Sequence, residues 1–175
     1  MDDRGLVERQ LGREARAFRR VVVRCPFGRP AVTEQDPYTS AGDPFPTTYY
    51  LTCKHLVAGV SRLEAAGGVE RWSAAAGDDP ALAASLSAAT GEQRRVRRAL
   101  AAGRSGSDGG SSLGLGIGGS RNPAQLKCLH AHVAFALARR GYELGDRIIA
   151  ELGDELWPAR CCLEPQPRAD YHPAS

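Results

Sequence analysis

Five cysteines and four histidines are the residues of this 175-residue chain best suited to chemistry. Seven of these nine residues fall in three short windows: Cys53 with His55, Cys128 with His130 and His132, and the adjacent pair Cys161 and Cys162. Thiolate and imidazole are typical zinc ligands, and thiolate is also a nucleophile. The clustering therefore indicates a shared metal site or thiol site.

The window around Cys128 lies in a strongly apolar segment. Asn122 followed by Pro123 is typical of a helix start, and Gly141 of a helix end, so we expect a helix from Asn122 to about Arg140. Between Cys128 and Ala138 the two histidines are the only polar side chains, which predicts burial on most sides. Such a helix would place Cys128 and His132 about 40° apart on one flank, with His130 nearly opposite. A metal ion would satisfy both groups, but a packed thiol and a hydrogen-bonded imidazole explain them as well.

The window around Cys53 lies where a predicted strand meets a predicted helix, Lys54 to Ala66. With Thr52 as the N-cap, Cys53 would lie in the first turn of the helix. The helix dipole and Lys54 would then lower the pKa of this thiol and favour the thiolate. Simple burial of the thiol under the strand–helix corner is an equally good explanation.

Three functional hypotheses follow from these residues. The leading one is a metal-binding protein with Cys53, Cys128 and His132 as ligands and a further ligand from a set of three: Cys25, His130 and Cys162. Mixed thiolate and imidazole ligands suit zinc first and iron second, and an open coordination position would permit hydrolysis. No Cys-x2-Cys pair is present, so distant segments would have to assemble the site.

The two alternatives need no metal. One is an enzyme with Cys53 or Cys128 as the nucleophile and His130 or His132 as the base. The other is a non-catalytic interaction module that docks a partner through its N-terminal helix and an arginine cluster: Arg94, Arg95, Arg97 and Arg98. A solvent-exposed helix face also explains that cluster.

A glycine-rich stretch precedes the apolar helix and is a candidate anion site. Its residues Gly118, Gly119 and Arg121 lie just before the expected helix N-terminus, where free amides favour anions, and Lys127 adds charge. A hinge is the alternative. The G-x-G-x-x-G pattern that starts at Gly114 follows a serine- and glycine-rich run rather than a strand, so it does not indicate a dinucleotide fold.

The periodicity of the chain predicts an α+β fold that is mostly helical, with a small antiparallel sheet packed on a central buried helix. We expect strands at Val21–Arg24, Ala31–Glu34 and Thr47–Thr52. The predicted organisation has four parts: an amphipathic helix within residues 1–20, a domain over 21–162, a flexible linker at 103–112 inside it, and a disordered tail at 163–175. Further helices are expected at Val69–Ala76, Pro80–Leu100 with a possible break near Gly91, and Leu144–Leu152.

Composition and charge limit the classes of partner and the cellular compartment that we expect. A net charge of +3 does not require a nucleic-acid partner. The partner is left open, with an anionic small molecule and a protein as the candidates. There is no run of about 18 apolar residues, and the first residues lack the pattern of a signal peptide, so we expect a cytoplasmic protein without a membrane span. In that compartment the cysteines are expected to be reduced, metal-bound or catalytic.

Four segments together resemble a known family: Arg24–Pro30, Pro44–Cys53, Ser61–Glu64 and Lys127–His132. The chain resembles the uncharacterised family called domain of unknown function 501, which is widespread in actinobacteria, over about Val21 to Cys162. The resemblance implies a bacterial cytoplasmic protein, often encoded near a septum-formation initiator-like gene, and it implies no assigned activity. Family members commonly have Thr-Cys-Pro where this chain has Thr52-Cys53-Lys54.

Overall fold

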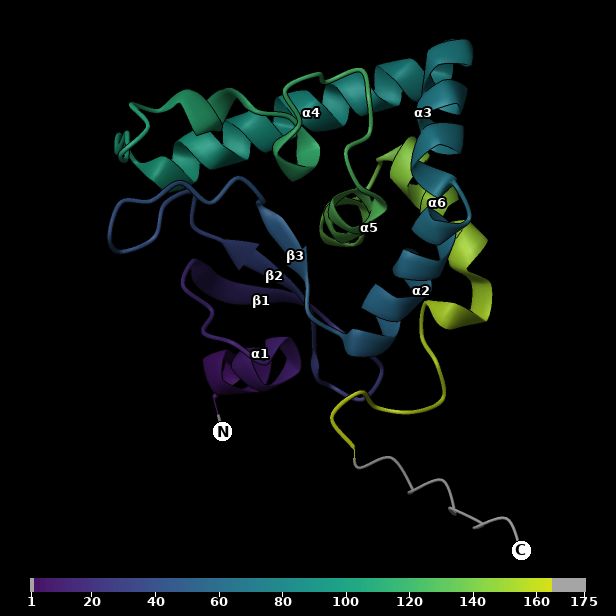
Figure 1. Cartoon of the computed structure of the whole chain (residues 1–175), viewed down its shortest axis with the longest axis horizontal. Coiled ribbons are helices and arrows are strands. Elements are labelled where there is room, and N and C mark those ends of the chain that lie inside the picture. Colours follow the sequence, from purple (N-terminus) through teal and green to yellow (C-terminus); the bar gives the residue numbers. More distant parts are fainter. Residues whose placement is uncertain (1, 165–175) are drawn as a thin grey trace, which may run out of the picture.

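The small sheet lies at one side of the molecule and has three antiparallel strands in the spatial order β1-β2-β3 (Figure 1). A computed structural model describes residues 2–164 of the chain. The strands are β1 (Phe18–Arg24), β2 (Pro30–Gln35) and β3 (Tyr49–Leu51). The β-branched run Val21–Val23 supplies the centre of β1, and Gly28, with φ +71°, allows the turn into β2. These strands confirm the predicted sheet.

Six helices are present in the described part of the chain. They are α1 (Asp3–Leu11), α2 (Lys54–Ala65), α3 (Gly68–Asp78), α4 (Pro80–Ala101), α5 (Leu129–Ala138) and α6 (Glu143–Leu152). Of these, α1 and α5 pack against the sheet. Three short 3-10 turns are also present: Ser111–Gly114 and Ile117–Gly119 between α4 and α5, and Gly153–Glu155 after α6. The helix α4 begins at an Asp79 cap followed by Pro80 and continues without a break through Gly91.

The N-terminal helix is shorter than its sequence pattern predicts. Gly12 adopts a left-handed conformation with φ +69°, and its amide donates to the Glu8 carbonyl, which ends α1. The chain then enters β1 at Phe18, so the helix occupies only the first half of the predicted region 1–20. The buried face of α1 carries Val7 and Gln10 against the sheet.

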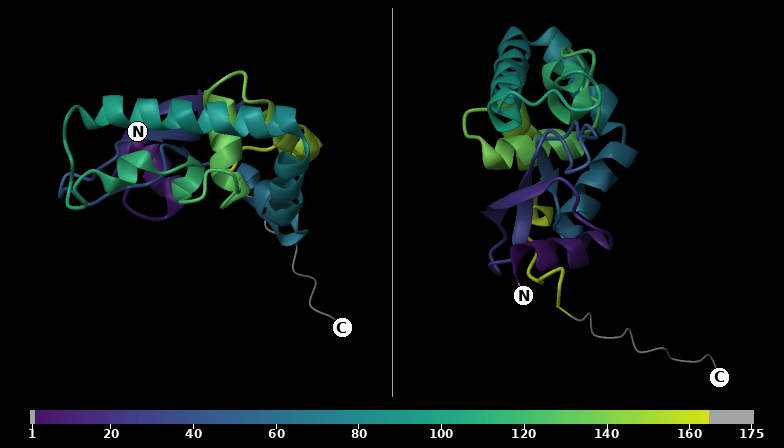
Figure 2. Two further views of the ribbon diagram at one scale, coloured as in Figure 1. Left: turned by 90° about the horizontal axis from the view of Figure 1, so that it is seen from above. Right: turned by 90° about the vertical axis from the view of Figure 1, so that its left-hand side faces the viewer.

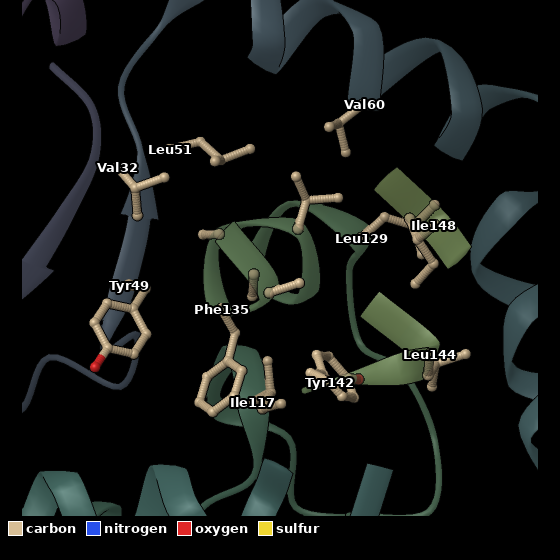
Figure 3. Packing of buried hydrophobic residues seen from close by; sticks show 14 of the residues in the cluster. Val32, Tyr49, Leu51, Val60, Ile117, Leu129, Phe135, Tyr142, Leu144 and Ile148 are labelled. Atoms are coloured by element: carbon tan, nitrogen blue, oxygen red, sulfur yellow. The ribbon is translucent and has the colours of Figure 1, made fainter. Parts of the chain in front are cut away.

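The apolar core is built around α5, which is seen end-on at the centre of Figure 1. Phe135 of this helix lies between two other rings, with 5.6 Å between ring centroids to both Tyr49 and Tyr142 (Figure 3). A Cβ on Gly145 of α6 would lie 2.6 Å from the Ala136 Cβ, so only glycine permits this close helix packing. The structure thus confirms a helix-dominated α+β fold in which the sheet packs on a central buried helix.

Two further views show α4 across one side of the molecule and α1 across the opposite side (Figure 2). Residues 103–112 form turns, in which the Asp108 carboxylate accepts hydrogen bonds from the Gly110 and Ser112 amides. Flexibility of this segment stays a prediction, and nearly all of the predicted tail at 163–175 lies outside the described residues. No helix of the described residues is long and apolar enough to cross a membrane.

Candidate functional site

Four of the five cysteines line one small cavity of about 10 Å³. Cys25 comes from the turn after β1, Cys53 from the start of α2, and Cys161 and Cys162 from the segment after α6. Figure 1 shows this last segment passing beneath the start of α2. All four are free thiols, and we call this group the sulfur cluster. It joins segments from both ends of the chain.

Helix α2 begins at Lys54 as predicted, but its N-cap lies one residue later than the sequence predicts. Cys53 is extended, with φ −67° and ψ 115°, and its carbonyl accepts the first helical hydrogen bond, from the Val57 amide. Thr52 still belongs to the sheet edge, where its amide donates to the Ala31 carbonyl. Cys53 is therefore the N-cap itself, and the expectation of a Thr52 cap is wrong.

The sulfur of Cys162 lies where hydrogen-bond donors converge. The Gln10 side chain donates to it from Nε2 at 3.3 Å, and the thiol of Cys53 and the amide of Lys54 also donate. These donors stabilise the thiolate and lower the pKa of Cys162 to about 5, with the Cys53 thiol as the largest cause. Gln10 is held in place because the same Nε2 donates to the Pro30 carbonyl at 2.8 Å.

Cys53 has the opposite protonation. Its hydrogen bond to Cys162 and its burial raise the pKa of its thiol, against a smaller lowering effect from the Leu56 and His55 amides. The prediction of a Cys53 thiolate is therefore wrong. The chain at Cys162 crosses the start of α2, so the Cys162 sulfur lies where the helix dipole favours a negative charge. Together the two sulfurs form a thiol–thiolate pair.

The second cysteine window lies at the start of α5, which is Leu129 rather than Asn122. Cys128 is the N-cap of this helix, outside its regular turns, with φ −158°. The Glu64 carboxylate of α2 accepts from the Leu129 amide at 2.5 Å, which satisfies one free amide of the first turn. Asn122 and Pro123 instead start a turn in which the Asn122 side chain accepts from the Ala124 amide. The helix expected from Asn122, and the shared flank of Cys128 and His132, are wrong for this reason.

His130 joins a short polar chain between α5 and α2. Its Nδ1 lies 3.1 Å from Glu64 Oε1, and its Nε2 lies 3.2 Å from Ser61 Oγ and 3.3 Å from the Val57 carbonyl oxygen. Both ring nitrogens thus face partners on α2. His130 and Cys128 line the same cavity of about 360 Å³, beside Tyr49 and Tyr50. Burial raises the pKa of Cys128, which keeps this thiol protonated.

His132 is buried on the other side of α5. Its Nδ1 lies 2.6 Å from the Tyr142 hydroxyl. Its buried Nε2 has no hydrogen-bond partner within residues 2–164. Burial lowers the pKa of His132 to about 3, so the ring is neutral. It does not line the cavity that holds Cys128 and His130, nor the sulfur cluster.

The predicted metal ligands therefore divide among three places. Cys25, Cys53 and Cys162 belong to the sulfur cluster, Cys128 and His130 to the cavity at the start of α5, and His132 to the core. Among residues 2–164, no three His, Cys, Asp or Glu side chains are grouped so that they could hold a metal ion. Zinc or iron binding stays a prediction, without support from this arrangement.

Part of the predicted anion site does come together. Gly119, Arg121 and Lys127 line one cavity of about 340 Å³, whereas Gly118 is turned toward Cys128, so that a Cβ there would lie 3.5 Å from its sulfur. Because α5 starts at Leu129, no helix N-terminus faces Arg121, and that part of the argument is wrong. Anion binding at these residues stays a prediction.

Three residues with clear contacts at these sites were missed by reasoning from the sequence: Gln10, Ser61 and Glu64. Ser61 and Glu64 are three residues apart on the predicted helix, which places them on one face. This shared face was a usable signal for a pair of polar side chains that point toward a neighbouring element. Gln10 offered none, since 152 residues separate it from Cys162.

The fold and the sulfur cluster define an α+β, helix-dominated protein with a thiol–thiolate pair at a helix start. Comparison with protein families adds a match over residues 21–150 to the family described as protein of unknown function, domain of unknown function 501. The chain belongs to this family. No curated protein and no solved structure matches the chain.

Proposed function

We propose that this protein is a thiol-based redox protein in which Cys162 reacts with a hydroperoxide and then forms a reversible disulfide with Cys53. The observation that carries the proposal is that Cys53 and Cys162 line one cavity at the start of α2 and that their interaction lowers the pKa of Cys162. A nucleophilic sulfur thus has a second thiol beside it. This is the arrangement that redox-sensor cysteines use.

The contacts of Cys162 support its role as the attacking sulfur. Hydrogen bonds from Gln10, the Lys54 amide and Cys53 stabilise its thiolate, which is the reactive form of cysteine. Cys162 is only partly buried, whereas Cys53 is 4% exposed. The thiolate is therefore the more accessible of the two sulfurs, and Cys53 is the resolving thiol.

The chemistry balances with a hydroperoxide as the oxidant. The Cys162 thiolate attacks one peroxide oxygen, so that an S–O bond forms, the O–O bond breaks, and the leaving oxygen takes a proton from water. The Cys53 sulfur then attacks the resulting sulfenic acid. The S–S bond forms, the S–O bond breaks, and the hydroxyl leaves as water with the Cys53 proton. Two electrons pass to the peroxide, and an external dithiol returns them by thiol–disulfide exchange.

Oxidation with hydrogen peroxide and peptide mapping by mass spectrometry test this function. The reduced full-length protein should form a Cys53–Cys162 disulfide that dithiothreitol reverses. In Cys53→Ser the reaction should stop at a Cys162 sulfenic acid, which dimedone traps. Cys128→Ser is the matched control, because it removes the other helix-capping thiol, and it should form the disulfide as the unmodified protein does.

Two results would contradict the proposal. One is oxidation of Cys128 or Cys25 while Cys162 stays reduced. The other is one zinc ion per chain in freshly purified protein that is lost in Cys53→Ser, since a thiolate held as a zinc ligand is not the free nucleophile that the proposal requires. The second result would return the metal hypothesis, now with the sulfur cluster as its ligands.

A further inference from the structure

A further cavity lies between the sheet and α4. It has a volume of about 420 Å³, and four arginines line it: Arg19, Arg20, Arg95 and Arg139. Val96, Ala99 and Leu100 of α4 give it an apolar wall. Cavities of this size hold small metabolites. We call it the arginine cavity.

Carboxylates neutralise only part of this charge. Glu34, whose side chain is 3% exposed, accepts from Arg20 Nε at 2.8 Å and lies 3.5 Å from Arg19 Nε. Glu92 pairs with Arg95 at 2.6 Å and lies 3.7 Å from Arg139 Nη1. Four guanidinium groups thus face two carboxylates, and two positive charges remain in excess at the arginine cavity.

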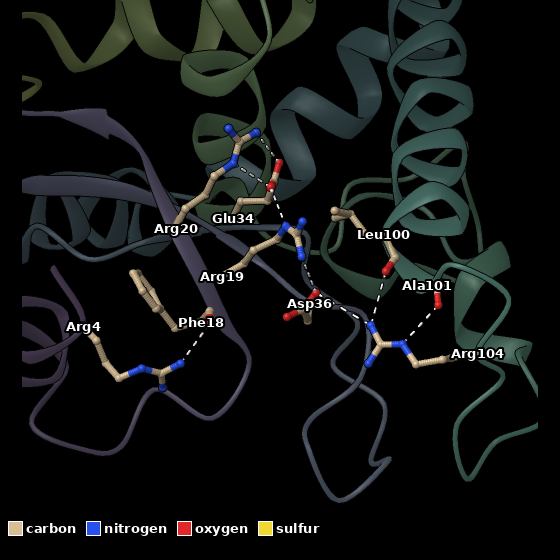
Figure 4. Close-up of polar contacts among 9 residues, drawn as sticks. All are labelled: Arg4, Phe18, Arg19, Arg20, Glu34, Asp36, Leu100, Ala101 and Arg104. Atoms are coloured by element: carbon tan, nitrogen blue, oxygen red, sulfur yellow. Dashed lines mark hydrogen bonds and ion pairs between the residues drawn. The ribbon is translucent and has the colours of Figure 1, made fainter.

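The neighbouring charges on the strand side balance one another. Figure 4 shows the sequence of contacts from Arg20 through Glu34 and Arg19 to Asp36 and Arg104. Arg19 Nη1 lies 3.3 Å from Asp36 Oδ1, and Arg104 Nη2 lies 3.8 Å from the same oxygen. Asp36 therefore takes up part of the charge of Arg19, while Arg104 adds one positive charge beside the arginine cavity. Counted together, these two residues leave the excess at two positive charges.

The guanidinium groups keep donors available for a ligand. The side chains of Arg20 and Arg95 are 64% and 67% exposed although both hold carboxylates. Each guanidinium has five N–H groups. Arg95 donates from Nε and Nη2 to Glu92, and Arg139 donates from Nε to the Tyr49 hydroxyl at 2.7 Å. The carboxylates orient the arginines at the edge of the cavity. Planar guanidinium forks match phosphate oxygens in geometry.

We propose that the arginine cavity binds a small organic phosphate, with the phosphate dianion against Arg95 and Arg139 and the organic part on the apolar wall of α4. The two excess positive charges match the two negative charges that a phosphate monoester carries above a pH of about 6. This site is independent of the thiol chemistry of Cys53 and Cys162. It also differs from the anion site predicted around Arg121.

Isothermal titration of the full-length protein with phenyl phosphate at pH 7.5 tests this assignment. One molecule should bind per chain, and Arg95→Gln should weaken binding about tenfold through loss of a charge-assisted contact. Arg98→Gln is the matched control, because Arg98 is an exposed arginine of the same helix that does not line the cavity. It should leave binding unchanged. Arg95→Lys should restore part of the affinity, since it returns the charge without the fork.

Thermal unfolding of the same variants separates binding from folding, because Arg95 makes an exposed ion pair whose loss costs little stability. Two results would overturn the proposal. One is the absence of saturable binding at millimolar phenyl phosphate. The other is equal weakening by Arg95→Gln and Arg98→Gln, which would indicate a general attraction of anions to the basic surface of α4.

Discussion

Two helices of this protein begin at a buried or half-buried cysteine, and the two helix starts differ in their chemistry. Cys53 caps α2 and Cys128 caps α5, and the pKa of each thiol is raised. At α2 a second sulfur, Cys162, takes up the hydrogen bonds and is the thiolate. At α5 the neighbours of the cap are His130 and Glu64. Glu64 accepts from the Leu129 amide and faces His130 Nδ1, and neither side chain contacts a thiolate among the described residues.

The difference shows that a helix N-terminus does not by itself activate a thiol. Burial opposes the helix dipole at both caps, and at Cys128 burial is the largest effect on the pKa. What distinguishes α2 is a second sulfur outside the helix, Cys162, which accepts hydrogen bonds that stabilise its thiolate. We therefore expect redox chemistry at the start of α2 and an inert, protonated thiol at the start of α5.

The largest expected effect tests whether the buried His132 of α5 is neutral at neutral pH. The folded protein holds His132 with a pKa of about 3, against 6.5 for an unperturbed histidine, so the unfolded chain binds the extra proton. The stability that a neutral His132 confers is present above pH 6.5 and is lost as the pH falls toward 3. Below pH 6.5 the loss should approach about 1.4 kcal/mol for each pH unit.

Urea unfolding at several pH values between 7 and 4.5 measures this effect. The difference between the unmodified protein and His132→Gln should change across this window, because the variant lacks the titrating ring. His130→Gln is the matched control on the same helix. Parallel pH profiles for the unmodified protein and His132→Gln would contradict the description of His132.

A smaller effect compares the two helix starts directly. At pH 6 the thiolate fraction of Cys162 exceeds that of an ordinary thiol by roughly 10³, while its lower basicity reduces its nucleophilicity. Cys162 should therefore react with iodoacetamide roughly tenfold faster than Cys128. Rates are followed site by site with mass spectrometry.

The pH profile sharpens this comparison. The Cys162 rate should rise with a midpoint near pH 5, and the Cys128 rate only in the alkaline range. In Cys162→Ser the fast reaction should disappear and Cys53 should stay slow. Transfer of the fast reaction to Cys53 would mean that the helix start alone activates a thiol, contrary to the comparison.

Local sequence signals predicted most of the fold. The β-branched run Val21–Val23 gave a strand, and the apolar spacing in Lys54–Ala66 gave a helix within one residue of its true end. These segments have a buried face with a clear period, so tertiary packing agrees with local preference. The helix start at Asn122 failed because a short local turn satisfies the same residues, while Glu64, distant in sequence, caps the helix at Leu129.

The site was predicted less well than the fold. Cysteine clustering drew attention to Cys53 and Cys162, which the structure places at one cavity, but it did not reveal in which of the two the pKa is lowered. That depends on the path of the chain after α6, which brings Cys162 to the start of α2, and on Gln10 from the opposite end of the chain. Contacts of such long range leave no periodic signal in the sequence. Chemistry that depends on them has to be read from the structure.

The smallest expected effect concerns Glu64. This carboxylate lies at the start of α5, whereas a second sulfur, Cys162, lies at the start of α2. Glu64 Oε1 accepts from the Leu129 amide and faces His130 Nδ1. Glu64→Gln keeps an acceptor oxygen but loses the charge, and Glu64→Ala loses both. We expect losses of about 0.5 kcal/mol and about 1–2 kcal/mol in the free energy of unfolding, by analogy with N-cap removal.

Urea unfolding measures both variants, with Glu70→Gln in the first turn of α3 as the matched exposed control. The two Glu64 variants should leave the fast alkylation of Cys162 unchanged, because Glu64 is not among the groups that set the pKa of Cys162. If Glu64→Ala instead slowed that reaction, the two helix starts would be coupled through α2, on which Glu64 lies, and could not be treated as separate sites. Equal stability of Glu64→Ala and Glu64→Gln would mean that the carboxylate acts through its charge alone and not as a cap.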